Sequence, residues 1–292
     1  MKNPLAHILV LATSVTGVFA QHRTSYAQYM FNGLLLNPAY AGSHDALNLT
    51  ALYRNQWAGI EGAPKAISFT AHSPLKKQKM SVGLTVENEE TGLFNHSHAL
   101  AIYSYRIKLK NSHLAFGLQA GVDSRSFNRD QLRIRDTDDP LYAQQATRTT
   151  VFTAGTGLYF YAARFYAGAA VPALTGVTGS PLIQVHGGGL LPVSADLIIK
   201  PSFLVRHLEN SPLYTNVSVT TYYREIFGFG AGYSHNSSWL VYADLKLNDQ
   251  LSFGYAHERA LGPIAGFNSG SHEVMLRYLF RYRITAINPR YF

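Results

Sequence analysis

Several segments of this chain alternate apolar and polar side chains with a period of two residues. Every second side chain is apolar in "MSVGLTVE" (80–87), and the same pattern runs through "LNLTALYR" (47–54), "LAFGLQAGVD" (114–123), "WLVYADLKL" (239–247) and "EVMLRYLFRY" (273–282). Successive side chains of a β-strand point to opposite faces of the sheet, so this period predicts strands with one apolar and one polar face. We therefore expect an all-β protein.

Two architectures would use such two-faced strands. In a soluble sandwich the apolar face forms the core and the polar face meets water. In a membrane barrel the apolar face meets lipid and the polar face lines the lumen. Here the polar face is rich in Gly, Ser, Thr and Tyr, and aromatic residues lie towards the strand ends of the other face. This distribution favours the barrel, with the sandwich as the alternative.

Composition also favours an outer-membrane barrel. Only 14% of the residues are charged, against about 25% in soluble domains, while there are 19 Tyr and 16 Phe. Residues 1–20 resemble a secretory signal, with Lys2 before an apolar run that ends in "VFA", and we expect cleavage after Ala20. That run is shorter than the roughly 20 residues of a spanning helix. The absence of cysteine excludes disulfides, thiolate metal sites and cysteine nucleophiles.

Fourteen segments satisfy the strand pattern, and single-chain bacterial barrels have an even number of strands. Residues 163–171 and 183–190 are the weakest because they are glycine-rich or alternate poorly, and Pro201 predicts a bulge or an interrupted ladder. Leu100 and Ile102 fall on the nominally polar face of their strand. The predicted strands are 47–54, 65–73, 79–88, 97–109, 112–123, 150–160, 163–171, 183–190, 195–206, 214–224, 226–234, 238–247, 250–258 and 271–282.

The predicted connections alternate in length. Long ones such as "NQWAGIEGAP", "NEETGLFN", residues 124–149 and "RALGPIAGFNSGS" alternate with short ones such as "PLKKQ" and "KNS", and "SHNS" is the single short outer loop. Membrane barrels have long outer loops and short periplasmic turns. We thus divide the chain into a signal peptide (1–20), an irregular segment (21–46) and a barrel with a C-terminal tail (47–292). The irregular segment is expected on the periplasmic side or inside the lumen, where it is shielded from lipid.

Two motifs near the start of the barrel identify a family. "QYMFNGLLLNPAYAGS" (28–43) followed by "YRNQWAGIEGAPKAISFTAHSPL" (53–75) resembles the signature of the PorP/SprF family, and "SHEVMLRYLF" with the closing "INPRYF" is similar to that family's last strand and tail. Lys65 departs from the small residue expected after "GAP". The residues that support the resemblance are Asn37, Pro38, Ala39, Tyr40, Gly42, Arg54, Gln56, Trp57, Gly59, Gly62, Ala63, Pro64 and His72.

The resemblance implies an outer-membrane component of the type IX protein secretion and gliding machinery, without catalytic residues. It implies outer-membrane lipid as surroundings and, as partners, periplasmic ring and cell-wall-linked subunits, or one large secreted adhesin or C-terminal-domain cargo. The protein would be a machine subunit or a cargo-specific partner. The alternative is a diffusion channel or ligand-specific porin, and a third possibility is an adhesin that binds through its own loops.

The motifs also have physical interpretations. "NPAY" predicts a turn in which Pro38 sets φ and the Asn37 side chain bonds its own backbone. The glycines of "GIEGAP" suit positive φ. Trp57 in the first outer loop is expected to pack at the lumen mouth, where a buried indole needs a hydrogen-bond acceptor. Stabilisation of the fold alone would explain all of these residues equally well.

Other chemistry is weakly supported by the sequence. His96 and His98 share a strand face near Glu89 and Glu90, but spacing fixes no third metal ligand. Ser234 and His235 are adjacent in a strand and point to opposite faces, so they make no catalytic pair. The basic clusters "KKQK" (76–79) and "RIKLK" (106–110) fall at short periplasmic turns, where they suit acidic partners or lipid head groups better than nucleic acid. We predict no enzyme activity, cofactor, metal or nucleic-acid partner.

Overall fold

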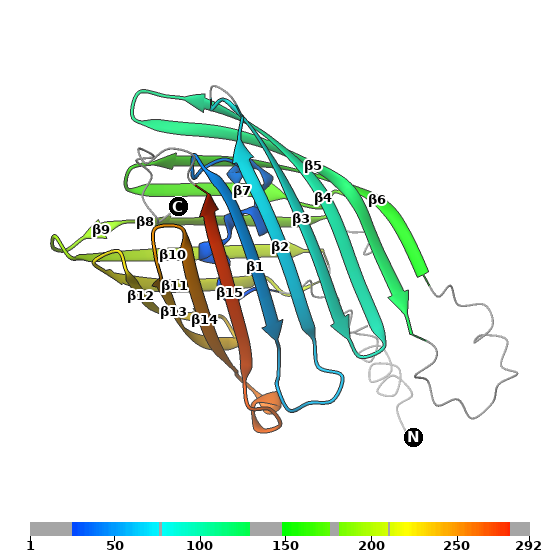
Figure 1. Ribbon diagram of the computed structural model, residues 1–292. Coiled ribbons are helices and arrows are strands. Elements are labelled where there is room, and N and C mark those ends of the chain that lie inside the picture. Colours follow the sequence, from blue (N-terminus) through cyan, green and yellow to red (C-terminus); the bar gives the residue numbers. More distant parts are fainter. Residues whose placement is uncertain (1–24, 76–77, 129–147, 176–180, 210, 281–292) are drawn as a thin grey trace, which may run out of the picture.

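The computed structural model describes residues 25–75, 78–128, 148–175, 181–209 and 211–280. The predicted signal peptide, the closing "INPRYF" and most of the longest loop lie outside the described residues. Within them, strands dominate and curve into one closed barrel around a short irregular segment (Figure 1). No helix in the described part of the chain has the length and apolar character needed to cross a membrane.

Fourteen antiparallel strands form the barrel wall, as the sequence predicts. Each strand pairs with the next along the chain, and β15 pairs back with β1, which closes the ring. The wall strands are β1 (Leu47–Asn55), β2 (Lys65–Pro74), β3 (Met80–Thr91), β4 (Phe94–Lys108), β5 (Ser112–Phe127), β6 (Arg148–Ala162), β7 (Phe165–Val171), β8 (Leu182–Gly189), β10 (Leu197–Leu208), β11 (Tyr214–Tyr223), β12 (Phe227–Ser234), β13 (Ser238–Lys246), β14 (Leu251–Ala260) and β15 (Ser271–Phe280).

The two faces of the wall separate as predicted. Phe229 and Leu118 point outward and are 62% and 61% exposed, whereas Thr50 and Thr85 point inward and are buried. Leu100 and Ile102 also point inward and are buried, so the mixed character of that strand reflects packing against the contents of the lumen. An apolar exterior around a polar interior is the arrangement of a barrel in lipid.

The weakly predicted strands β7 and β8 both form. One glycine each of β5, β6 and β7 leaves room for atoms inside the barrel: a Cβ at Gly117 would collide with the backbone of Ala39, and one at Gly157 or Gly168 would collide with the Asn37 side chain. The glycines of β8 instead lie against residues of the neighbouring wall strands. The glycine-rich sequence of β7 therefore reflects the close approach of the segment inside the barrel, and that of β8 reflects packing within the wall.

Pro201 interrupts one of the two ladders of β10, as expected. On one side β10 pairs continuously with β11 through Pro201. On the other side β8 pairs as far as Ser202, and the two-residue strand β9 (Leu191–Pro192) pairs with Ile198 and Ile199. Proline has no N–H to donate, which explains why the second ladder breaks here.

The prediction of a long loop at "NEETGLFN" (88–95) is wrong. β3 runs on to Thr91 and β4 begins at Phe94, which leaves only Gly92 and Leu93 as the turn. Gly92 has a φ of +57°, a conformation that favours glycine. The polar residues of this segment pair across the hairpin instead of forming a loop, so this outer connection is short.

The ends of the barrel can be told apart by their connections. β1 starts and β15 ends at the end with the short turns, and the connections after β1, β5, β7 and β14 make the opposite end the long-loop end (Figure 1). The connection after β14 contains the 3₁₀ helix η5 (Pro263–Gly266). In bacterial outer-membrane barrels short turns face the periplasm. The long-loop end is therefore the outer end and the short-turn end the periplasmic end.

A charge on the outward face should destabilise the barrel. Leu118 lies near the middle of β5, and Leu118→Arg should lower the free energy of unfolding in lipid vesicles by about 2–4 kcal/mol, because arginine is costly at mid-depth in the bilayer. The matched change Leu213→Arg, in the connection after β10, should cost at most about 1 kcal/mol. Equal effects at the two positions would contradict the lipid-facing assignment of Leu118.

Candidate functional site: the filled lumen

The segment before β1 lies inside the barrel. Residues 25–46 form three short 3₁₀ turns, η1 (Tyr29–Phe31), η2 (Gly33–Leu35) and η3 (Pro38–Tyr40), drawn in dark blue within the ring of strands (Figure 1). Almost every side chain of this segment is buried. Of the two places that the sequence allowed for it, the segment occupies the lumen. We call residues 25–46 the plug.

The plug runs from the long-loop end of the barrel to the short-turn end. Ala27 and Gln28 bond to Glu273, near the outer start of β15, whereas Asp45 lies 2.8 Å from Arg106, near the periplasmic end of β4. Between these points the plug touches β2, β6, β8, β10 and β11. Irregular backbone is tolerated at membrane depth here because the wall supplies its hydrogen-bond partners.

A buried carboxylate holds the outer end of the plug. Glu273 is fully buried, and its two oxygens accept hydrogen bonds from the backbone N–H groups of Ala27 and Gln28, each at 2.8 Å. Arg54 donates to the same carboxylate at 3.4 Å and to Glu258 at 2.5 Å. Charge-assisted bonds of this kind are stronger than neutral ones. The two bonds from Ala27 and Gln28 hold the plug, and the two bonds of Arg54 hold the carboxylates in place. We call these three side chains the outer anchor.

Two further buried cations meet the plug's backbone near its first turn. The Lys200 ammonium lies 3.4 Å from the carbonyl oxygen of Met30, and Arg277 donates to the carbonyl of Phe31 at 3.4 Å. Arg277 also lies 4.0 Å from Asp244. Short 3₁₀ turns leave carbonyl groups without intrahelical partners, and these two side chains donate hydrogen bonds to two of them.

The NPAY motif fits the plug against β6–β8. The Asn37 side chain accepts from the backbone N–H of Ala39 at 2.9 Å, which is the local bond that the sequence predicts, and Pro38 opens η3. The side-chain amide nitrogen of Asn37 donates to the carbonyl of Leu158 at 2.7 Å. Tyr40 packs edge-on against Tyr159, with ring centroids 5.4 Å apart. The motif is thus a wall contact as well as a turn.

The periplasmic end of the plug depends on Gly42 and His72. Gly42 has a φ of +78°, and its N–H donates to Nδ1 of His72 on β2 at 2.9 Å. Because Nδ1 accepts, His72 is bound as the tautomer without a proton there. Arg106 bonds Asp45 and the Tyr161 hydroxyl and closes this end.

The first outer loop makes backbone contacts. Gly59 and Gly62 have the positive φ values that the sequence predicts, +99° and +72°. The N–H of Gln56 donates to the carbonyl of Pro64, and Ala58 bonds Gly270 in the loop after β14.

Trp57 differs from expectation. Its backbone N–H donates to Ser271, and its indole makes no hydrogen bond among the described residues. The first outer loop is therefore tied to its neighbouring loop through backbone groups, and the Trp57 side chain is half-buried.

The structure joins the two sequence motifs, because Gly42 of the first bonds His72 of the second. It also places Arg54 beside two acidic residues, Glu258 and Glu273, that were not predicted as its partners. Glu258 and Glu273 lie more than 200 positions from Arg54 and gave no local signal. Glu273 does lie on the predicted polar face of the last strand, and a buried carboxylate that faces a lumen needs a hydrogen-bonding or charged partner. Its partner becomes evident only once β15 is placed against β1.

The two histidines considered as metal ligands have carboxylate partners. His98 lies 2.6 Å from Glu87, and His96 contacts Asp123. In the described part of the chain no set of three or more His, Asp or Glu side chains is arranged to hold a metal ion.

Comparison with known proteins gives a family and a fold. Residues 18–278 match the family model "Type IX secretion system membrane protein PorP/SprF". Among curated proteins, none matches the chain. The toluene transporter TbuX of Ralstonia pickettii is similar in structure, with a TM-score of 0.53 and 11% identity over 86% of this chain and 93% of that one. Omp33 of Acinetobacter baumannii has a TM-score of 0.48 and 7% identity over 82% and 100%.

Loss of the outer anchor should be costly. Glu273→Ala should lower the free energy of unfolding by about 2–5 kcal/mol, because it leaves two buried N–H groups of the plug without acceptors and removes one of the two carboxylates that Arg54 bonds. The double variant with Arg54→Ala should lose less than the sum of the single effects, since the two residues interact. The control Glu61→Ala, in an exposed loop, should change stability by at most about 0.5 kcal/mol. Urea unfolding in detergent measures all four, and additive losses would contradict the pairing.

Proposed function

Because the chain belongs to the PorP/SprF family of type IX secretion system membrane proteins, we propose that it is a non-enzymatic outer-membrane subunit of that machinery. In this role the barrel is a fixed platform in the membrane that other secretion proteins bind. The filled lumen is the observation on which this proposal rests. A barrel whose interior is occupied from one end to the other by its own chain is suited to assembly, and much less to diffusion of solutes.

The porin alternative is disfavoured by the same observation. Porins keep a water-filled channel. Here Tyr29, Tyr40 and Asn37 of the plug are buried against the wall, and bonds to the plug come from six or more strands around the ring. Similar barrels include transporters, yet at 11% identity the likeness to TbuX concerns fold alone.

The side chains considered for catalysis do not converge within the described part of the chain. Ser234 is buried and His235 is exposed, so the adjacent pair does not converge. The two histidine–carboxylate pairs of the lumen have no serine, threonine or tyrosine hydroxyl bonded to the histidine among the described residues. We infer that the protein acts by contact.

The periplasmic rim supports a protein partner on that side. Lys79, Lys108, Lys110 and Arg164 are exposed on three neighbouring turns between β2 and β7. The remaining rim mixes acids with bases: Arg224 lies 3.3 Å from Asp196, Lys246 lies 2.7 Å from Asp249, and Glu225 is a further exposed acid. Lys108 follows the inward-facing parity of β4, so it points to the periplasmic mouth and not to lipid. We name these four residues the basic rim and propose that it binds an acidic surface of a periplasmic secretion subunit.

Reversal of the basic rim should break the complex. The fourfold change of Lys79, Lys108, Lys110 and Arg164 to Glu should remove periplasmic secretion subunits from the protein purified out of native outer membranes, because like charges then face each other. Lys65→Glu, at the long-loop end, is the control and should leave co-purification unchanged. Mass spectrometry of the eluates measures both.

Conductance separates the two functions. The unmodified protein in a planar bilayer should show no stable channel. Steady conductance together with purification of the barrel alone would refute the secretion role and favour a porin.

A further inference from the structure

Two histidines face each other on the outer surface of the barrel wall. His257 of β14 and His272 of β15 are directly opposite in the register of these neighbouring strands (Figure 1), and their ring centroids lie 5.0 Å apart. Both side chains are half-buried. They lie far apart in the sequence, so only the pairing of β14 with β15 brings them together. We call them the outer histidine pair.

The pair lies at the outer rim of the lipid-facing surface. His257 follows Tyr255 along the outward face of β14, and His272 precedes Val274 on the outward face of β15. Trp239 of β13 packs edge-on against the His257 ring, with centroids 6.4 Å apart. Aromatic side chains mark the interface between lipid and water in outer-membrane barrels. An ion dissolved outside the cell can therefore reach both rings.

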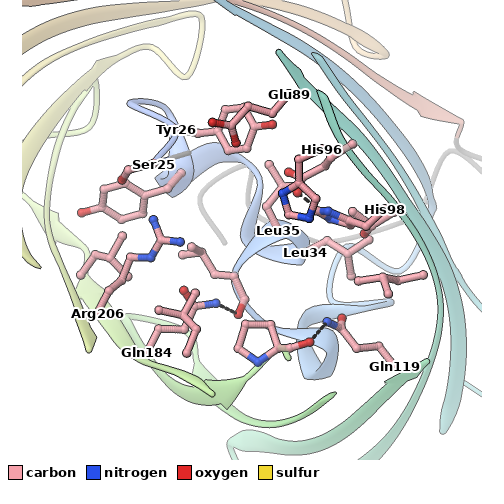
Figure 2. Close-up of a pocket in the computed structure, with 18 residues that line it drawn as sticks. Ser25, Tyr26, Leu34, Leu35, Glu89, His96, His98, Gln119, Gln184 and Arg206 are labelled. Atoms are coloured by element: carbon pink, nitrogen blue, oxygen red, sulfur yellow. Dashed lines mark hydrogen bonds and ion pairs between the residues drawn. The ribbon is translucent and has the colours of Figure 1, made fainter. Parts of the chain in front are cut away.

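The histidines inside the barrel have different partners. His96 and His98 lie side by side in the lumen (Figure 2), where Asp123 and Glu87 form ion pairs with them. By contrast, no carboxylate of the described residues forms an ion pair with the outer histidine pair. The outer pair is thus both more accessible and less occupied than the pair in the lumen.

Three of the four ring nitrogens of the outer histidine pair make no hydrogen bond among the described residues. The fourth, Nδ1 of His272, lies 2.7 Å from the hydroxyl oxygen of Tyr255. When this Nδ1 carries the proton and donates it to Tyr255, the lone pair of Nε2 is free to bind a metal. Metal-binding histidines characteristically donate their second N–H in this way, which fixes the tautomer and the orientation of the ring.

The separation of the two rings fits a shared metal ion. A metal about 2.0 Å from a ring nitrogen lies about 3.2 Å from the centre of that ring. Two imidazoles bound to one ion at about 90–109° then have centroids about 4.5–5.2 Å apart. The 5.0 Å between the centroids of His257 and His272 falls in this range.

We propose that the outer histidine pair binds one divalent transition-metal ion, and that Cu²⁺ binds most tightly. Neutral imidazole suits Cu²⁺, Ni²⁺ and Zn²⁺, and the affinity of a given site is highest for Cu²⁺. Two protein ligands leave other positions on the ion open to water or to a ligand from a partner at the cell surface. The site is separate from the plug and the basic rim, so this inference goes beyond the secretion role and does not rest on it.

The fluorescence of Trp239 reports an ion at this site. The chain has two tryptophans, so Trp57→Phe leaves Trp239, which contacts His257, as the only one. In this full-length protein in detergent, Cu²⁺ should quench the emission saturably, and EDTA should restore it. His257→Asn and His272→Asn, each in the same background, should raise the free Cu²⁺ concentration at half quenching at least about tenfold, because each removes one of two ligands.

His235→Asn is the matched control. His235 is exposed in the turn after β12, at the same end of the barrel, and its loss should leave the half-quenching concentration unchanged. The heat-dependent shift in gel mobility checks that each variant is folded. Equal quenching in all the folded proteins, or no saturable quenching up to about 1 mM Cu²⁺, would overturn the proposal.

Discussion

The hydrogen-bonded closure of β1 against β15 is the contact on which the rest of the structure depends. Lipid offers no partners to backbone groups, so a sheet in a membrane must have no free edge. The register of this closure sets Arg54 opposite Glu273 on the lumen side. It thereby creates the outer anchor, which holds the start of the plug. Closure of the wall and filling of the lumen are two results of the same pairing.

The plug explains features of the wall that alternation alone does not. Gly117, Gly157 and Gly168 leave space where the plug's backbone and the Asn37 amide approach. Lys200 and Arg277 are buried in the filled lumen, where a charge without a partner is costly, and carbonyl groups of the plug give both of them partners. The lumen side of the strands is accordingly built for a resident segment of the same chain.

The sequence predicted the wall well because a strand in a membrane barrel has two strongly different faces, and a period of two is visible in any single segment. It failed at "NEETGLFN", where polar residues form a hairpin beyond the lipid and so lack the apolar face. The motif residues Asn37, Gly42 and Arg54 were recognisable, and the Asn37 turn followed from local chemistry. Their contacts with Leu158, His72 and Glu273 were not predictable, although His72 itself was recognised as a motif residue, because those contacts depend on the register around the ring and on the path of the plug.

Cross-linking in the membrane tests the central claim, that residues 25–46 fill the barrel. The chain has no cysteine, and Thr70 of β2 bonds Asn32 of the plug at 3.2 Å. Asn32→Cys with Thr70→Cys should form a disulfide in native outer membranes, whereas Asn32→Cys with Leu118→Cys, which faces lipid, should not. A disulfide in the first pair alone is the predicted result. Absence of a bond between positions 32 and 70 in the folded barrel would contradict a filled lumen.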